Sequence, residues 1–181
     1  MNKLINRSIL AAALGALLAV GNLAAAAKDT SLAGQVRHEL SMLPYYGVFD
    51  AISYEVNGHS VILTGAVHYP AIALDAVNVV QHIPGVEAVD NQIEVLPVSR
   101  FDDQIRLAAW RTAYSWPSLS RVASMPQPPV RILVKNGNIT LVGIVPSQTD
   151  KDALSLRLNS VPGVFAVQNN LTVEHPPSHK S

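Results

Sequence analysis

The sequence predicts an α+β fold of two tandem two-layer domains, each in the order helix, strand, strand, helix, strand. Two observations lead to this prediction. One stretch of the chain recurs farther along it, and both copies carry alternating, β-branched runs interleaved with segments of helical spacing. In each copy a helix connects the second strand to the third. That pair should therefore be parallel, giving a small mixed three-stranded sheet with two helices covering one face.

The repeat aligns residues 63–95 with residues 141–173 at a constant offset of 78 and without a gap. Identical residues fall at turns and on alternating apolar positions, as in Pro84-Gly85 and Pro162-Gly163. Two copies of about 70 residues indicate a tandem of small domains, because a solenoid usually needs three or more units.

The first copy begins with an amphipathic helix. Leu32, Val36 and Leu40 recur at helical spacing, and Asp29 or Thr30 can cap the helix. The chain then alternates on both sides of an Asn-Gly pair, which is typical of a hairpin because both residues tolerate a positive φ. The predicted elements are a helix over 30–43, strands over 49–56 and 60–67, a helix over 70–82 and a strand over 86–96.

The second copy repeats this order with one addition. Its elements are expected over 102–114 (helix), 130–135 and 138–145 (strands), 148–160 (helix) and 164–174 (strand). The addition is the segment 115–129, which contains four prolines and is predicted to be an irregular connection.

Most glycines of the two copies fall at matching positions. None belongs to a GxGxxG or GxxxxGK[ST] arrangement, so no phosphate-binding loop of those kinds is predicted. We therefore assign a structural role in turns to Asn57, Gly58, Gly65, Gly85, Asn136, Gly137, Gly143 and Gly163.

Residues 1–27 are typical of a secretory signal peptide. Lys3 and Arg7 precede an apolar run, and the small residues 24–27 follow it. An uncleaved anchor is the alternative, but the run is shorter than the roughly 20 residues that a spanning helix needs. We expect cleavage, export to a bacterial periplasm and no transmembrane span in the mature chain. The expected parts are then a first domain over 28–98, a second over 99–175 and a flexible tail over 176–181.

The repeated pattern resembles the BON domain. It consists of a glycine in the second strand, a Gly-Val pair after the second helix, then a valine and an asparagine: Gly65, Gly85-Val86, Val89 and Asn91, and again Gly143, Gly163-Val164, Val167 and Asn169. Two such domains behind a signal peptide are similar to the osmotically inducible periplasmic protein family. The resemblance implies a non-enzymatic role in envelope integrity, through phospholipid binding or a chaperone-like activity. The acylated Cys of the lipoprotein relatives has no counterpart, which argues against a permanent membrane anchor.

No catalytic constellation is recognisable in the sequence. The chain has no Cys, which excludes disulfides, Cys-ligated zinc and thiol catalysis. His175 and His179 lie beside prolines that prevent a helical metal site. Asp102 and Asp103 stand at a helix start, where capping and dipole stabilisation are favoured over acid-base chemistry. With no GxSxG motif either, we predict no enzymatic activity, no metal and no cofactor.

The first helix of the second copy carries the candidate binding site. Aligning the two copies places Ile105, Ala109 and Thr112 in the core stripe, so the opposite side is apolar, aromatic and basic. The first copy is polar there, with His38 and Ser41. The candidate lipid- or partner-binding residues are Arg106, Leu107, Trp110, Arg111 and Tyr114.

Three interpretations of this helix face remain open: packing in the core or against the first domain, contact with a membrane surface, or contact with a protein. Trp and Tyr suit a lipid–water boundary, and an Arg near an anionic surface contributes about 1 kcal/mol. Our hypothesis is a periplasmic envelope-maintenance protein whose second domain binds an anionic phospholipid surface or an envelope protein. The alternative is a soluble periplasmic chaperone or a protein-interaction adaptor.

The net charge of the chain is zero, because 13 Lys and Arg balance 13 Asp and Glu. Nothing in this balance favours a nucleic-acid partner, and we predict none. The total nevertheless hides an asymmetry. Residues 28–99 hold two basic and eight acidic residues, a net of −6, and residues 100–181 hold nine and five, a net of +4. This agrees with a second domain that meets an anionic surface, and equally with attraction between the two domains.

Overall fold

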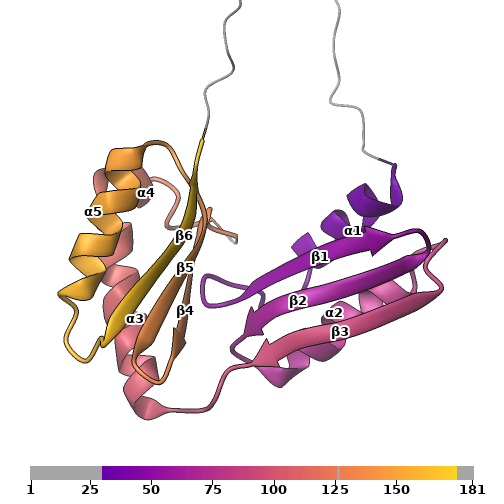
Figure 1. The fold of residues 1–181 in the computed structure, drawn as a ribbon, viewed down its shortest axis with the longest axis horizontal. Coiled ribbons are helices and arrows are strands. Elements are labelled where there is room, and N and C mark those ends of the chain that lie inside the picture. Colours follow the sequence, from indigo (N-terminus) through magenta and orange to yellow (C-terminus); the bar gives the residue numbers. More distant parts are fainter. Residues whose placement is uncertain (1–29, 126, 175–181) are drawn as a thin grey trace, which may run out of the picture.

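The computed structural model describes residues 30–125 and 127–174 (Figure 1). The predicted signal peptide, the predicted tail over 176–181 and both His175 and His179 lie outside these residues. Within them the chain forms two α+β units, each with a mixed three-stranded sheet and helices on one face. The predicted fold class is therefore confirmed.

The first unit has one helix cap that the sequence analysis did not identify. Ser31, rather than Asp29 or Thr30, caps the first helix, and its hydroxyl accepts a hydrogen bond from the amide of Gly34 at 3.0 Å. The helix therefore begins two residues later than predicted. The elements of this unit are α1 (Leu32–Ser41), β1 (Ala51–Asn57), β2 (Ser60–Val67), α2 (Pro70–Gln81) and β3 (Ala88–Val95).

The second unit repeats this order and adds a short helix. Its elements are α3 (Arg100–Tyr114), α4 (Pro117–Ser120), β4 (Val130–Lys135), β5 (Asn138–Val145), α5 (Gln148–Asn159) and β6 (Ala166–Val173). Ser99 caps α3, so Asp102 lies within the first turn instead of at the cap. Its carboxylate binds elsewhere: its two oxygens accept hydrogen bonds from the amides of Asn136 (2.9 Å) and Gly137 (2.8 Å) in the β4–β5 turn.

Both sheets have the predicted mixed topology. The middle strand pairs antiparallel with the first strand and parallel with the third, in the orders β1-β2-β3 and β4-β5-β6. Val61 of β2 lies opposite Val56 and Val89, and the residues 78 positions later pair in the same way. The internal repeat is thus preserved residue by residue through both sheets.

The two hairpin turns occupy equivalent positions but differ in conformation. In the first, Gly58 has φ +62°, whereas Asn57 is still the last residue of β1. In the second, both Asn136 (φ 51°) and Gly137 (φ 77°) are left-handed, as a type I′ turn requires. Asn57 therefore precedes the first turn, and the Asn-Gly pair predicted there is shifted by one residue relative to that of the second hairpin.

Gly65 and Gly143 lie inside β2 and β5, not in turns as predicted. Their φ angles are +113° and +127°. A Cβ on Gly65 would stand 2.1 Å from the carbonyl oxygen of Ala51, and a Cβ on Gly143 would stand 1.9 Å from that of Pro129. Glycine is needed here because the first strand of each sheet enters close to the middle strand at this point.

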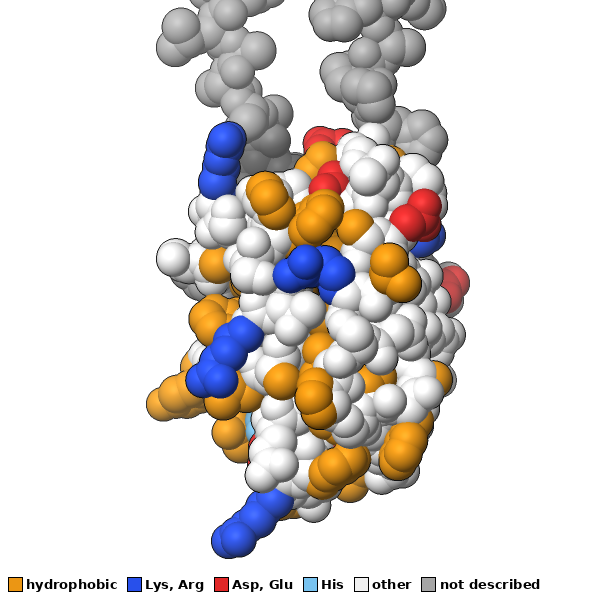
Figure 2. Space-filling model, turned by 90° about the vertical axis from the view of Figure 1, so that its left-hand side faces the viewer, with side chains coloured by type: hydrophobic (Ala, Val, Ile, Leu, Met, Phe, Trp, Pro, Cys, Tyr) orange, Lys and Arg blue, Asp and Glu red, His pale blue; other side chains and the backbone are white. Residues whose placement is uncertain are grey.

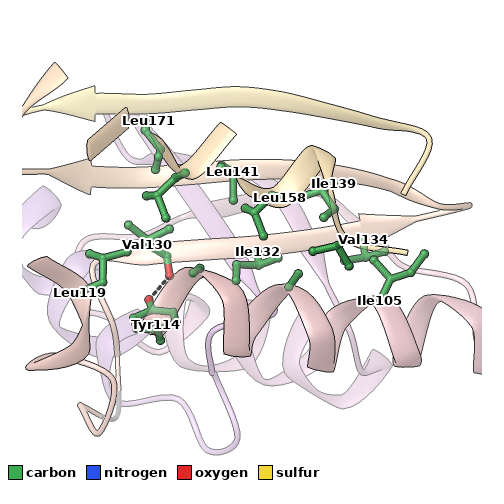
Figure 3. Close-up of a cluster of buried hydrophobic side chains, with 14 of the residues drawn as sticks. Ile105, Tyr114, Leu119, Val130, Ile132, Val134, Ile139, Leu141, Leu158 and Leu171 are labelled. Atoms are coloured by element: carbon green, nitrogen blue, oxygen red, sulfur yellow. Dashed lines mark hydrogen bonds between the residues drawn. The ribbon is translucent and has the colours of Figure 1, made fainter. Parts of the chain in front are cut away.

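Each unit has its own hydrophobic core between the helices and the sheet. The second core contains Ile105, Leu141 and Leu158, which lie between α3, α5 and the sheet in Figure 3. The first core is built in the same way around Val36 and Leu63. The residues between these inward positions point to the open face of each sheet, and this alternation fixes the register of the strands.

The segment 115–129, predicted to be irregular, contains the short helix α4. Pro117 is at its first position, where a missing N–H is tolerated. The Trp116 Nε1–H and the Ser118 hydroxyl each donate to Oδ1 of Asp150 at 2.8 Å, and the Arg157 guanidinium lies 5.4 Å from the Trp116 ring centroid. The segment is thereby fixed to the start of α5.

The two units contact each other at the edge strand β4. The amide of Ile132 donates to the carbonyl of Val48 at 2.8 Å. The Arg131 guanidinium donates to the carbonyl of Gly47 at 2.7 Å and lies 4.8 Å from the ring centroid of Tyr46. A loop of the first unit therefore completes the edge of the second sheet, a contact that the sequence analysis did not predict.

Candidate functional site

The structure divides the five predicted binding residues into two groups. Arg106 and Tyr114 are only 2% and 5% exposed, so the prediction that they lie on the outward face of α3 is wrong. The error lies in the width of the buried stripe. Ile105 and Ala109 are in the core as predicted, but Ala113 completes the line where Thr112 was expected, and β4 covers the flank on which the two side chains lie.

The two buried side chains bind the backbone of β4. The Arg106 Nη2 group donates to the Val134 carbonyl at 2.8 Å, and its Nη1 group donates to Asp103 at 2.6 Å. The Tyr114 hydroxyl donates to the Val130 carbonyl at 2.6 Å, the bond drawn in Figure 3. Burial raises the pKa of Tyr114 to about 12. Both residues therefore have a structural role at this strand edge.

Trp110 is half-buried and packs against the core of the second unit. Its ring centroid is 6.3 Å from that of Tyr114. Of the interpretations left open by the sequence, core packing describes this side chain, and the core in question belongs to its own unit. Trp110 is therefore removed from the candidate binding residues.

Leu107 and Arg111 do lie on the outward side of α3, and Leu107 is 46% exposed. Other exposed side chains of the same helix layer extend this surface: Phe101 (47%), Leu156 on α5 (75%) and Phe165 before β6 (76%). We call the resulting set the aromatic-basic face. It consists of Arg100, Phe101, Leu107, Arg111, Leu156 and Phe165.

Two glycines support the aromatic pair of this face. The Phe101 and Phe165 ring centroids are 6.4 Å apart. A Cβ on Gly163 would lie 2.9 Å from the Phe101 ring, and a Cβ on Gly137 would lie 2.5 Å from the Phe165 ring. Each ring therefore rests on bare backbone, which holds it at the surface of the molecule without burying it.

The helix-covered side of the second unit combines positive charge with apolar side chains. Figure 2 shows this side: Lys and Arg are scattered among hydrophobic side chains, whereas Asp and Glu gather near one end. Such a surface can contact an anionic, partly apolar layer, because Arg attracts phosphate while exposed aliphatic and aromatic groups enter the apolar boundary.

Leu156 and Phe165 were missed in the sequence. Comparing the two copies at these positions, as was done for α3, would have identified both. Leu156 occupies the position of Asn78 in the first copy, and Phe165 occupies that of Glu87, both at the offset of 78. At each position a polar residue of the first copy is replaced by a large apolar residue in the second, and this replacement is the signal in the sequence that indicates an apolar surface. Applied to every exposed position, it marks α5 and the turn before β6 as well as α3, and in the first domain it marks Leu74 on α2, whose counterpart is Asp152.

No group of three or more His, Cys, Asp or Glu side chains that could hold a metal ion occurs within residues 30–125 and 127–174. In these same residues, none of the helices has both the length and the apolar character needed to cross a bilayer.

Comparison with known proteins yields one family and several structural likenesses. A family model described as the BON domain matches residues 28–97 and 118–175. Curated proteins gave no match. The C-terminal domain of CdsD, a structural protein of the type III secretion system of Chlamydia trachomatis, is 13% identical, with a TM-score of 0.29. The likeness covers 81% of this chain and 98% of that one. A second CdsD structure has the same identity and TM-score, with 93% of its chain covered.

Proposed function

The chain belongs to the BON domain family, with two copies in tandem, and from this membership we propose a non-enzymatic function in maintaining the cell envelope. BON domains are associated with envelope and periplasmic proteins and with phospholipid binding. In our proposal the protein acts in the periplasm and binds phospholipid membrane surfaces through its second BON domain. The observation that supports this assignment is the aromatic-basic face together with its charge: the first domain also exposes apolar side chains, such as Leu74 (66%), but its residues 28–99 have a net charge of −6, whereas residues 100–181 have +4.

The aromatic-basic face supports membrane contact through two forces. Arg100 and Arg111 are exposed and can approach lipid phosphates, each contributing about 1 kcal/mol near an anionic surface. Leu156 and Phe165 are three-quarters exposed, and burying such a side chain contributes about 1.5–3 kcal/mol. Neither force alone gives stable binding, so the affinity should depend on both the charge of the lipid and the apolar side chains.

Vesicle co-sedimentation tests the proposal with a matched pair of variants. The purified protein should sediment with vesicles containing phosphatidylglycerol and remain in solution with phosphatidylcholine alone. Leu156→Glu should weaken binding by about tenfold or more, because it removes an apolar contact and adds a repelled charge. Asn78→Glu adds the same charge at the equivalent exposed position of the first domain and should leave binding unchanged. Equal weakening by both variants, or equal binding to both lipids, would refute the assignment.

One observation favours a second candidate function, the holding of extended segments of other exported proteins. The Ile52 amide at the outer edge of β1 donates to the Tyr46 hydroxyl at 2.9 Å. Farther along that edge, the amides of Tyr54 and Val56 donate to no other group in the described part of the chain. An unpaired edge can accept an extended peptide by backbone hydrogen bonding.

The two functions differ in their response to salt and to one substitution. Lipid binding through Arg side chains should weaken as salt rises, whereas pairing along a strand edge should not. Val56→Pro removes an amide that has no partner among the residues that the structure describes, so it should leave vesicle binding unchanged. If the edge holds clients, the same variant should lose the ability to suppress aggregation of an unfolded exported protein in light-scattering assays.

A further inference from the structure

An Asn-Gly pair stands at each hairpin, Asn57-Gly58 where β1 ends and Asn136-Gly137 within the turn between β4 and β5, and the two pairs have different surroundings. We propose that Asn57 is a site of spontaneous deamidation and that Asp102 protects Asn136 from the same reaction. Deamidation of Asn57 is a covalent modification of the first domain and does not depend on membrane binding.

The reaction requires a main-chain nitrogen that is free to act as a nucleophile. The nitrogen of the residue after Asn loses its proton to base and attacks the side-chain Cγ. A C–N bond forms, the side-chain amide leaves as ammonia, and a five-membered succinimide remains. Water then opens either carbonyl of the ring and gives aspartate or isoaspartate. In sum, one amide and one water become one carboxylic acid and one ammonia, and no oxidant or metal is needed.

The nitrogen of Gly58 meets this requirement. Asn57 and Gly58 are both exposed, and apart from Gly58 and its two chain neighbours no described residue has an atom within 4 Å of the position that a Cβ on Gly58 would occupy. The Gly58 amide donates to no other group in the described part of the chain. The Asn57 side-chain Nδ2 donates to exposed Glu55 at 3.2 Å, and the strand pairing of Asn57 with Ser60 does not involve the Gly58 nitrogen. The turn lies at the end of the first sheet away from the second domain (Figure 1).

The main-chain nitrogen of Gly137 is not free to act as a nucleophile. Gly137 is buried, and its amide donates to Oδ1 of Asp102 at 2.8 Å. Removing a proton that is held by a carboxylate would place two negative charges side by side. The Phe165 amide donates to the Gly137 carbonyl at 2.9 Å, as the Glu87 amide does to the His59 carbonyl at 2.8 Å in the first turn, so the difference between the turns lies in Asp102. Its second oxygen holds the neighbouring Asn136 amide at 2.9 Å. The turn therefore cannot rotate into the geometry of attack without breaking these bonds.

Conversion of Asn57 would alter the first domain in two ways. It would add one negative charge to a domain that already has a net charge of −6. The isoaspartate product would also insert a methylene group into the main chain at the residue that pairs with Ser60, next to the hairpin turn. The product is therefore detectable by both its charge and its main-chain connectivity.

Incubation at mildly alkaline pH followed by peptide mass spectrometry tests the proposal in the unaltered protein. Cleavage after Glu releases residues 56–87, and trypsin releases residues 136–151. Fragmentation then locates each conversion. We expect Asn136 to convert about 10- to 100-fold more slowly than Asn57, the factor that corresponds to one charge-assisted hydrogen bond. Equal rates, or faster conversion of Asn136, would overturn the proposal.

Two controls separate the effect of the fold from that of local sequence. In urea both sites should convert at similar rates, because Asp102 no longer contacts Gly137. A difference that persists in urea would show that the fold is not its cause. Asp102→Asn should accelerate conversion of Asn136 toward the rate of Asn57, with folding checked by circular dichroism. A folded variant without this acceleration would refute the protective role of Asp102.

Discussion

Arg106 and Tyr114 close the edge of β4 from the side of α3. The carbonyls that they bind, on Val134 and Val130, point away from the sheet, as does the Ile132 amide that donates to the first domain. Residues two apart on a strand direct their backbone groups the same way, so these three contacts occupy one edge. Side chains of a helix and a loop of another domain thus replace a neighbouring strand.

Replacing Arg106 with Met should destabilise the second domain. The side chain is buried, and the Val134 carbonyl would lose its partner, so we expect the free energy of unfolding to fall by about 2 kcal/mol. Arg111→Met on the exposed face of the same helix should change it by less than about 0.5 kcal/mol. Urea denaturation followed by circular dichroism measures both values. Similar losses in the two variants would contradict the structural role given to Arg106.

α3 illustrates how far periodicity in the sequence predicts structure. Apolar spacing located the helix to within two residues and identified Ile105 and Ala109 as buried, because both properties are set by neighbours along the chain. It failed for Arg106 and Tyr114, whose burial depends on where β4 lies. Spacing along one helix does not reveal which flank another element covers.

The missed contacts share a physical cause. Asp102 binds a turn more than thirty residues away, and the edge of β4 is completed from the other domain. Such contacts join residues that are distant in the sequence, and no periodicity or motif in the sequence links them. The fold class, by contrast, follows from local periodicity present twice in the chain, and the aromatic-basic face was predictable in part because two copies could be compared.

At the scale of elements, Asp150 joins the segment 115–129 to α5. Hydrogen bonds from Ser147 and then Trp116 lower the pKa of Asp150. Asp150→Ala should therefore reduce the free energy of unfolding by about 1–2 kcal/mol, through loss of the bonds from Trp116 and Ser118. Asp152→Ala is the control, because within residues 30–125 and 127–174 that exposed carboxylate accepts a hydrogen bond only from Gln148. Thermal denaturation compares the two, and equal melting temperatures would contradict the prediction.

The same carboxylate sets a pH dependence for its contribution. Its pKa is lower in the folded state than the usual 3.8, so the unfolded state binds more protons in acid. The contribution of Asp150 to stability is present above pH 3.8 and is lost as the pH falls below it. The destabilisation measured for Asp150→Ala should accordingly shrink in acid.

At the scale of the whole molecule, His68 makes the domain contact sensitive to pH. It follows β2 of the first domain, and its Nε2 lies 3.9 Å from Asp103 of α3, which also binds Arg106. The carboxylate of Asp50 accepts from the His68 amide at 2.7 Å. Burial lowers the pKa of His68 below 6.5, the charge of Arg106 lowers it further, and the two carboxylates partly oppose this.

The sign of the pH effect follows from this lowered pKa. Below pH 6.5 the unfolded chain binds a proton at His68 that the folded chain resists, so the stabilisation present above pH 6.5 decreases on acidification. Urea midpoints at pH about 7.5 and about 5.5 measure the decrease. In His68→Gln the decrease should be smaller. A variant that loses as much stability as the unaltered protein would exclude His68 as the cause.

Because the Ile132 amide donates to the Val48 carbonyl, the order of the two domains along the chain affects how the edge of β4 is covered. The first domain supplies the acceptor and is synthesised first, so it is already present when the edge of β4 forms. A fragment beginning at residue 99 would expose the Ile132 amide in the middle of that edge, where it could pair with another fragment. We therefore expect the fragment to self-associate more than the full chain does, because only the full chain carries the Val48 carbonyl that occupies this amide.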